Sequence, residues 1–319
     1  MGQRDQDQLV ELLLDARSDL GEGPIWHPDR GALSWVEIYD GRVNWLELDG
    51  SPGESVEVGR RVGAAVPATD GTLALATDEG FAYINGDGEY ALVAAVEADR
   101  EDSFMNDGRC DAVGRFWAGT VGVNERGLAA EGAGSLYCLE TDGKVRRVLG
   151  GVSLSNGMDW STDGLTFYYI DSRTAGIDAF AFDLSTGALA DRRRFVELEF
   201  RAEVGFADGM CVDADGGLWT AIWGVGEVRR YSPAGELDRT ISLPVTQPTS
   251  CVFAGDALDV LVITTARRGL PAEELERQPH AGSVFCCHPG PTGLPPNPCR
   301  CVTLLENSQK EPDASSVAD

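Results

Sequence analysis

The sequence predicts an all-β protein folded as a six-bladed β-propeller. A short phrase returns about six times along the 319 residues: a Gly or other small residue, a few apolar positions, an Asp-Gly or Asp-x-x-Gly turn, and an apolar or Trp-containing strand. Long helical periodicity is nearly absent, and Asp-Gly turns close apolar and aromatic runs, as in β-hairpins. A repeat of about 40 to 50 residues containing several strands is typical of one propeller blade.

The repeats and the segments outside them divide the chain into three parts. The copies of the phrase cover residues 23–35, 70–75, 108–117, 157–169, 209–219 and a degenerate 255–263. We expect an N-terminal segment at 1–17, the propeller at 18–306 and a disordered polar tail at 307–319. Within the first segment, residues 6–16 are compatible with a short helix or with the outer strand that closes the propeller.

The charge balance excludes two classes of partner. Acidic residues number 52 and basic residues 26, so the formal net charge is −26. Such a surface does not neutralise nucleic-acid phosphates or dock on anionic lipid. No run approaches the roughly 18 apolar residues of a membrane helix, and the N-terminus is not typical of a signal peptide. We therefore expect a cytoplasmic protein.

The eight cysteines are expected to be reduced thiols in that compartment. Four lie near the C-terminus, as the adjacent pair Cys286-Cys287 and as Cys299-x-Cys301. Neither spacing fits the paired C-x₂-C template of a zinc site. We interpret them as buried strand thiols.

Polar residues in one register of the repeats indicate a binding site. The innermost strands of a propeller line a central channel, and the residues before the repeat glycines are Glu22, Asp107, Asn156 and Asp208. Carboxylate and amide oxygens of this kind suit a hard divalent cation. The alternative interpretation is that Asp and Asn before Gly cap turns.

Several segments resemble the signature stretches of the SMP-30/gluconolactonase/regucalcin family. They are LGEGPIW at 20–26, NDGRCD at 106–111, SNGMDWS at 155–161, DGMCVD at 208–213 and PTSCVF at 248–253. The similarity covers roughly residues 18–295, in the same order. It implies a six-bladed propeller with one divalent metal in the channel and hydrolysis of sugar lactones or, in some branches, of other esters.

The resemblance also implies roles for individual residues. Glu22, Asn156 and Asp208 would hold the metal, and Asn106 would touch the substrate or a water on the metal. Asp107 would then be a neighbouring turn residue. Asp208 is expected to act also as the general base, with activation of water by the cation itself as the alternative.

One position departs from the family pattern. Many lactonases of the family carry an Arg two residues before the Asn of Asn-Asp-Gly, where this chain has Phe104. Phe104 is therefore expected to be a substrate-binding residue, but its apolar ring cannot hydrogen-bond a sugar hydroxyl as the Arg does. Glu131 is a candidate for a further substrate-binding acid, with Glu125 as its alternative. Arg109 is interpreted as structural.

The sequence lacks the catalytic motifs of other hydrolase mechanisms. There is no Gly-x-Ser-x-Gly elbow, and of the three histidines His27 is expected to lie in an exposed loop. Most tryptophans occupy repeat-equivalent positions and are expected to pack blades together, whereas Trp223 lies outside that register and is the candidate for the channel mouth.

These observations lead to one leading function and several alternatives. We expect divalent-metal-dependent hydrolysis of an aldonolactone to the aldonic acid, with a small sugar lactone as the partner molecule. The metal is Ca, Zn, Mn, Mg or Fe(II), since all accept oxygen ligands. An arylesterase or phosphotriesterase on the same metal, a non-catalytic calcium-binding propeller, and a scaffold for protein partners are the alternatives. The chain is expected to be a monomer or a small homo-oligomer.

Overall fold

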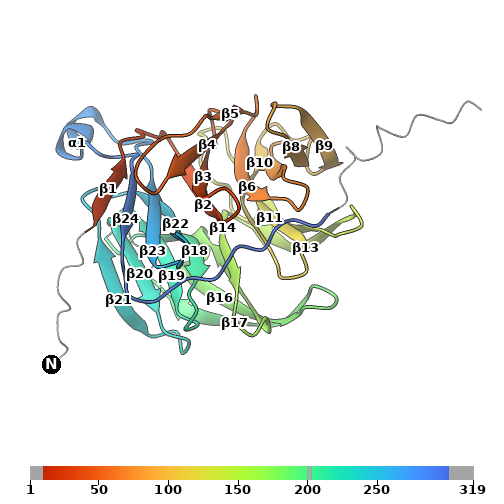
Figure 1. Cartoon of the computed structure of the whole chain (residues 1–319). Helices are drawn as coiled ribbons and strands as arrows, with labels where there is room; N and C mark the ends of the chain where they lie inside the picture. Colours follow the sequence, from red (N-terminus) through yellow and green to blue (C-terminus); the bar gives the residue numbers. More distant parts are fainter. Residues whose placement is uncertain (1–9, 200, 202, 302–319) are drawn as a thin grey trace, which may run out of the picture.

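A computed structural model describes residues 10–199, 201 and 203–301 (Figure 1). In these residues the strands form six four-stranded antiparallel sheets. In five of the sheets the four strands follow one another along the chain, and in the sixth the outermost strand comes from the N-terminal part of the chain. The predicted tail at 307–319 lies outside the described residues. The strands of blades 1 to 3 are β2 (Gly21–His27), β3 (Ala32–Glu37), β4 (Arg42–Glu47), β5 (Val56–Glu57), β6 (Val62–Pro67), β7 (Leu73–Thr77), β8 (Gly80–Ile84), β9 (Tyr90–Ala95), β10 (Ser103–Cys110), β11 (Phe116–Gly122), β12 (Gly134–Leu139) and β13 (Val145–Val152). Those of blades 4 to 6 are β14 (Ser155–Trp160), β15 (Thr166–Asp171), β16 (Gly176–Asp183), β17 (Ala188–Glu197), β18 (Phe206–Val212), β19 (Leu218–Trp223), β20 (Glu227–Tyr231), β21 (Leu237–Ser242), β22 (Pro248–Ala254), β23 (Val260–Thr265), β24 (Val284–Cys287) and β1 (Glu11–Leu14).

The first strands of the six sheets form a closed ring. β2 contacts β6, β6 contacts β10, β10 contacts β14, β14 contacts β18, β18 contacts β22, and β22 returns to β2. This arrangement confirms the predicted all-β, six-bladed propeller. Each copy of the repeated phrase covers the first two strands of a blade or the turn between them.

The ring is closed by a strand from the other end of the chain. β1 pairs antiparallel with β24 and completes the sixth sheet, with Glu11 opposite Cys286. Residues 11–14 therefore form the outer closing strand rather than a helix. Two short helical segments occur in the described residues, the 3₁₀ turn η1 (Ser172–Thr174) and α1 (Ala272–Arg277). No helix in this part of the chain has the length and apolar character needed to cross a bilayer.

Buried aspartates fix the hairpins between the two inner strands of blades 3 and 5. Asp111 accepts three backbone N–H groups of its own turn, and its second oxygen accepts Trp117 Nε1 at 2.9 Å and Arg115 Nε at 2.6 Å. Asp213 makes the equivalent bond to Trp219 Nε1 at 2.8 Å. The Asp-to-Trp spacing of the repeat is thus explained, because the turn residue binds the indole of the next strand.

The position of His27 in the structure differs from the one that the sequence predicted. His27 is the last residue of β2 and is 5% exposed, so the expectation of an exposed loop residue is wrong. Its Nε2 lies 2.7 Å from Ser34 Oγ, and its ring centroid lies 4.5 Å from that of Trp45. The strand continues one residue past Trp26, so the turn begins only after the imidazole. Burial lowers the pKa of His27 to about 4.

The C-terminal strap (residues 290–301) crosses the propeller after β24, as the dark blue segment in Figure 1 shows. It is held by backbone hydrogen bonds from Gly293 N to Leu258 O at 2.7 Å and from Arg300 N to Gly114 O at 2.9 Å. Cys299 and Cys301 lie in this irregular strap and not in a strand, which corrects that part of the prediction. All eight cysteines are free thiols.

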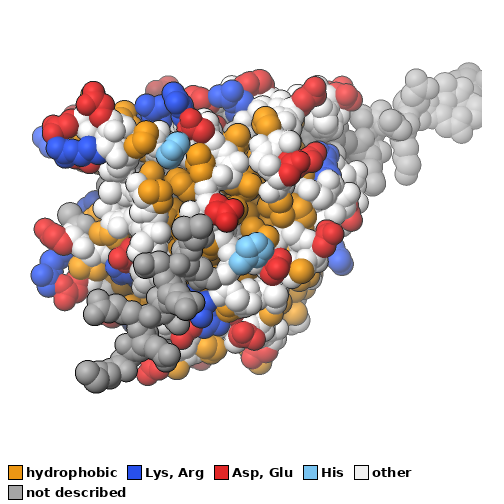
Figure 2. Space-filling model, turned by 60° about the vertical axis from the view of Figure 1, so that its left-hand side comes forward, with side chains coloured by type: hydrophobic (Ala, Val, Ile, Leu, Met, Phe, Trp, Pro, Cys, Tyr) orange, Lys and Arg blue, Asp and Glu red, His pale blue; other side chains and the backbone are white. Residues whose placement is uncertain are grey.

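The surface carries the charge in a mixed pattern. Figure 2 shows acidic and basic side chains interspersed on the visible face, with no extended basic patch. The whole chain has 52 acidic and 26 basic residues, so an extended basic surface is not expected.

Candidate functional site

A register shift in the innermost strand of each blade aims polar side chains into the channel. The pairing between the first two strands shifts between Met105 and Asp107 in blade 3, between Ser155 and Met158 in blade 4, and between Ala207 and Met210 in blade 5. Blades 1, 2 and 6 contain shifts in the corresponding strand pairs. A bulge of this kind redirects a side chain out of the regular alternation of a strand.

Glycines beside the bulges allow the inner strands to approach one another. A Cβ atom on Gly157 would lie 2.6 Å from Asp208 O, and one on Gly209 would lie 2.1 Å from Ser250 Oγ. Any larger residue would therefore push neighbouring blades apart. This close approach explains why the predicted ligands Asn156 and Asp208 are each followed by Gly.

Four polar residues predicted for the site, from four blades, line one cavity of about 330 Å³. They are Glu22 from β2, Asn106 from β10, Asn156 from β14 and Asp208 from β18. Their exposed fractions are 6%, 8%, 5% and 5%, respectively. The structure thus brings together residues that are far apart in the chain.

A chain of hydrogen bonds orients the two amides. Asn106 Nδ2 donates to Asn156 Oδ1 at 2.9 Å, and Asn156 Nδ2 donates to Ser172 Oγ at 2.8 Å. Ser172 Oγ in turn donates to Ala207 O at 2.6 Å, next to Asp208. Because an amide oxygen has two lone pairs, Asn156 Oδ1 retains one acceptor position.

The two carboxyls of the cavity, Glu22 and Asp208, are buried near each other, which disfavours their charged forms. Burial raises the pKa of Glu22 well above its ordinary value, and the nearby Asp208 and Asp107 raise it further. The pKa of Asp208 is raised by burial and by Asp107. No Arg or Lys of the described residues is among the causes of either shift, although Arg173 lines the same cavity. Buried carboxylates are costly without a cationic partner, so this site favours a bound cation.

Asp107 and Glu131 lie outside this cavity. Asp107 lines a smaller space of about 10 Å³ with Gly23 and Ser250, accepts Gly108 N at 2.7 Å, and has its pKa raised by burial to about 6. Glu131 is exposed in the loop after β11 and is not among the lining residues, although Leu128 of the same loop is.

The rest of the cavity wall is largely apolar. Phe104 is buried, and its ring centroid lies 6.0 Å from that of Tyr39 in an edge-on contact. Leu128 and Trp223 line the same space, so Trp223 does reach the site for which it was a candidate. This wall contrasts with the polar group formed by the carboxylates and amides.

Sequence reasoning missed several lining residues. Tyr39, Leu128, Ser172 and Arg173 all line the cavity, and none belongs to the repeated phrase. Ser172 and Arg173 belong to η1, directly after the end of β15. Loops that follow the second strand of a blade return to the same end of the channel. The position of these residues after a second strand was therefore the feature of the sequence that could have indicated them.

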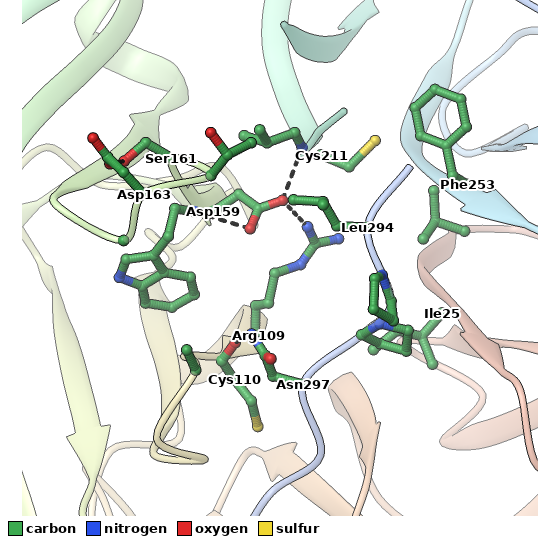
Figure 3. Close-up of a pocket in the computed structure, with 18 of the residues that line it drawn as sticks. Ile25, Arg109, Cys110, Asp159, Ser161, Asp163, Cys211, Phe253, Leu294 and Asn297 are labelled. Carbon is green, nitrogen blue, oxygen red and sulfur yellow. Dashed lines mark hydrogen bonds and ion pairs between the residues drawn. The ribbon is translucent and has the colours of Figure 1, made fainter. Parts of the chain in front are cut away.

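A second cavity, of about 360 Å³, lies at the other ends of the same inner strands (Figure 3). Asp159 is three residues beyond Asn156, which corresponds to about 10 Å along a strand. Arg109 forms an ion pair with Asp159 there, and Asp159 also accepts Val212 N at 2.9 Å. Arg109 therefore lines the second cavity and not the first.

Comparisons with known proteins find one family along most of the chain. The family model described as "SMP-30/Gluconolactonase/LRE-like region" matches residues 20–267. The chain is 36% identical to regucalcin from Danio rerio over 90% of this chain and 97% of that protein. It is 37% identical to regucalcin from Sus scrofa over 91% of this chain and 97% of that protein.

A solved structure is similar over nearly the same length. A protein from Agrobacterium tumefaciens, described as a calcium-binding protein, regucalcin, superimposes with a TM-score of 0.86 at 28% identity, covering 92% of this chain and 98% of that one. The family match and the regucalcin relatives confirm the resemblance found in the sequence. The chain belongs to the SMP-30/gluconolactonase/LRE-like family.

Proposed function

We propose that this protein is a divalent-metal-dependent lactonase that opens a sugar lactone to the free acid. The observation that carries the proposal is the convergence of Glu22, Asn156 and Asp208, two buried carboxyls and a buried amide from three blades, on one cavity. The family description, which includes gluconolactonases, supports the choice of reaction.

The residues fit a hard divalent cation. The described residues contain no group of three or more His, Cys, Asp or Glu side chains arranged to hold a metal, and the proposed ligand set combines two carboxylates with an amide. Asn156 Oδ1 has a free lone pair, and Ser172 holds the amide so that this oxygen faces away from η1. Glu22, Asn156 and Asp208 would hold the ion, and ligands of oxygen alone are compatible with Ca, Mg, Mn, Fe(II) or Zn.

The chain's own residues then carry the proton and orient the substrate. A bound divalent ion supplies polarisation of the lactone carbonyl. Asp208 accepts a proton from the attacking water as its oxygen bonds to the carbonyl carbon, and returns that proton to the ring oxygen when the C–O bond breaks. Asn106, fixed against Ser155 O and Asn156, lies in the cavity where it contacts the substrate.

A second candidate is an arylesterase or phosphotriesterase on the same metal. The observation that favours it is the apolar wall formed by Phe104, Tyr39, Leu128 and Trp223. These side chains offer a surface to an aromatic or alkyl group and few hydrogen bonds to sugar hydroxyls.

The experiment compares substrates and metals on matched variants. Hydrolysis of glucono-, xylono- and arabinono-lactone is measured beside an aryl ester and an organophosphate, each after chelation and after metal is restored. Asp208→Ala should lose at least about a hundredfold in activity because ligand and base are removed together, and Glu22→Gln should weaken metal binding. Glu236→Gln, which changes an exposed carboxylate of the same blade, is the control.

Three outcomes separate the alternatives. Near-full turnover by Asp208→Ala contradicts the mechanism. Faster hydrolysis of the aryl ester than of every lactone favours the second candidate. Tight metal binding without any hydrolysis favours a calcium-binding protein without catalysis.

A further inference from the structure

Arg109 presents unused hydrogen-bond donors to the second cavity. Its side chain is 20% exposed, and Nη1 donates to Asp159 Oδ2 in the ion pair already described. A guanidinium has five N–H donors in one plane. Nε and Nη2, which carry the two parallel N–H groups of one edge, donate to no acceptor in the part of the chain that the structure describes. That edge is therefore available to a ligand.

Asp159 does not occupy the remaining donors of Arg109. Its Oδ1 accepts Trp160 N at 2.9 Å, and its Oδ2 accepts Val212 N at 2.9 Å in addition to the Arg109 bond. Both carboxylate oxygens thus have partners, and the ion pair holds the guanidinium between β10, β14 and β18. A guanidinium fixed in this way can bind a carboxylate through two parallel N–H···O bonds.

The cavity wall on one side of Arg109 is apolar. Figure 3 shows Leu294, Ile25 and Phe253 on that side, whereas Ser161 and Asp163 lie on the other. Ile25 and Phe253 are 6% and 2% exposed and come from blades 1 and 6. A ligand on this side would therefore place its apolar part against two packed side chains and the strap.

The strap forms a wall that does not depend on backbone hydrogen bonds. Gly293 N donates to Leu258 O and Cys299 N donates to Pro67 O, both at 2.7 Å, and between them residues 294–298 make no backbone–backbone hydrogen bond with other described residues. Three of these five residues are prolines, which have no N–H donor and a restricted φ angle. Because the prolines and the flanking bonds fix this wall, a ligand loses little free energy in ordering it.

The cavity is large enough for a small molecule and opens to solvent. Its volume of about 360 Å³ lies within the range of roughly 300–1,000 Å³ that is usual for ligand sites. Thr162, Asp163 and Leu294 among its lining residues are exposed, so they form its rim. Asp163 accepts Ser161 Oγ at 2.6 Å and Leu165 N at 3.0 Å within its own turn, and solvent screens its charge.

We propose that the second cavity binds a small organic acid with a compact apolar body. Its carboxylate lies on the Nε–Nη2 edge of Arg109, and its body packs against Ile25, Phe253 and Leu294. The sugar acid expected from the proposed lactonase reaction does not meet this description, because its hydroxyl groups would find few partners on an apolar wall. The site is therefore separate from the reaction proposed for the first cavity.

The test is titration calorimetry of the full-length protein with three probes. Naphthalene-2-carboxylate has both the charge and the apolar body, naphthalene-2-carboxamide has the body without the charge, and gluconate has the carboxylate without the apolar body. The carboxylate probe should bind at least about tenfold more tightly than either of the others, because hydrogen bonds between two charged groups are the strong ones.

Variants place the probe in the cavity. Arg109→Gln should weaken binding of naphthalene-2-carboxylate about 10- to 100-fold, and thermal unfolding checks that it folds without the cation beside Asp159. Leu294→Asp adds a carboxylate at an exposed rim position, 41% exposed, and should weaken binding about three- to tenfold through repulsion, whereas Leu294→Lys should not weaken it.

Two controls separate this cavity from other sites. Leu237→Asp changes an exposed residue at the start of β21 that does not line the cavity, and Asn156→Ala changes the first cavity; both should bind the probe as the wild type does. Equal binding of carboxylate and carboxamide, wild-type affinity in Leu294→Asp or in folded Arg109→Gln, loss of binding in Asn156→Ala, or no saturable binding at all would overturn the proposal.

Discussion

Replacing Ser172 by Ala removes the hydroxyl that links Asn156 to the backbone beside Asp208. Ser172 is 6% exposed, accepts Asn156 Nδ2 at 2.8 Å and donates to Ala207 O at 2.6 Å. The substitution leaves one amide N–H and one carbonyl without these partners. It also frees the Asn156 amide to rotate, so that its NH₂ group competes with the oxygen for the proposed metal position.

The magnitude follows from the two lost bonds. A neutral hydrogen bond contributes about 0.5–1.5 kcal/mol, so the free energy of unfolding should fall by about 1–3 kcal/mol. Loss of a residue that orients a metal ligand typically weakens metal binding about 10- to 100-fold. Because Ser172 does not itself contribute a proposed ligand, binding should weaken without being abolished.

The assay is titration calorimetry with calcium chloride, accompanied by thermal unfolding of the metal-free protein. Ser172→Thr keeps a hydroxyl and should recover most of the affinity, whereas Ser185→Ala changes an exposed serine of the same blade and should have no effect. Asn156→Ala is measured in parallel. Wild-type affinity in Ser172→Ala together with weakened binding in Asn156→Ala would refute the positioning role, and wild-type affinity in both would refute the metal site.

Three further predictions concern other parts of the molecule. Phe104→Gln should raise kcat/KM for a hydroxylated lactone relative to an unsubstituted one by about two- to tenfold, through one new hydrogen bond. Gln is chosen instead of Arg because the Arg61 guanidinium lies 5.2 Å from the Phe104 ring centroid and would repel a second cation. An unchanged ratio would show that position 104 does not contact the substrate. For His27, the pKa of about 4 in the folded state against the ordinary 6.5 means that the unfolded state binds the proton more readily, so stability is lost as the pH falls below about 6.5. Between pH 7 and pH 5 this loss is about 2 kcal/mol of the free energy of unfolding. Urea unfolding at both pH values measures it, and the loss should be absent from His27→Gln. An equal pH dependence in the two proteins would contradict the low pKa of His27. Asp111→Ala should cost about 3–5 kcal/mol because it leaves the buried Arg115 guanidinium without its carboxylate. Asp70→Ala, at an exposed turn in which the carboxylate accepts only Thr72 groups, should cost less than about 1 kcal/mol, and equal losses would refute the role of the buried pair.

The repeated phrase predicted the architecture because each blade makes the same local contacts. Asp111 with Trp117, and Asp213 with Trp219, are turn-to-strand pairs within single hairpins, and such pairs leave a fixed spacing in the chain. His27 was predicted wrongly because the end of a strand is the least regular part of the phrase, where contacts to Ser34 and Trp45 decide whether the side chain faces the interior.

The candidate site was only partly visible in the sequence. The residues before the repeat glycines indicated Glu22, Asn156 and Asp208, but the same register in blade 3 indicated Asp107, whereas Asn106 is the residue that lines the cavity. The bulge between Met105 and Asp107 turns Asn106 into this space. A bulge leaves no mark in the pattern of apolar residues, so this difference of one position was not predictable from spacing.

The amino-acid sequence by itself determined the blades, because strand alternation and Asp-Gly turns act between residues that are close in the chain. It also determined the acidic surface and which residue types were available for a cation. Only the tertiary structure decided which of those residues meet, which loops cover them, and that Ser172 and Arg109 face partners many residues away. The physical reason is that closing the ring of inner strands brings side chains from separate blades within hydrogen-bond distance, and the distance between two blades across the channel is not encoded in either blade alone.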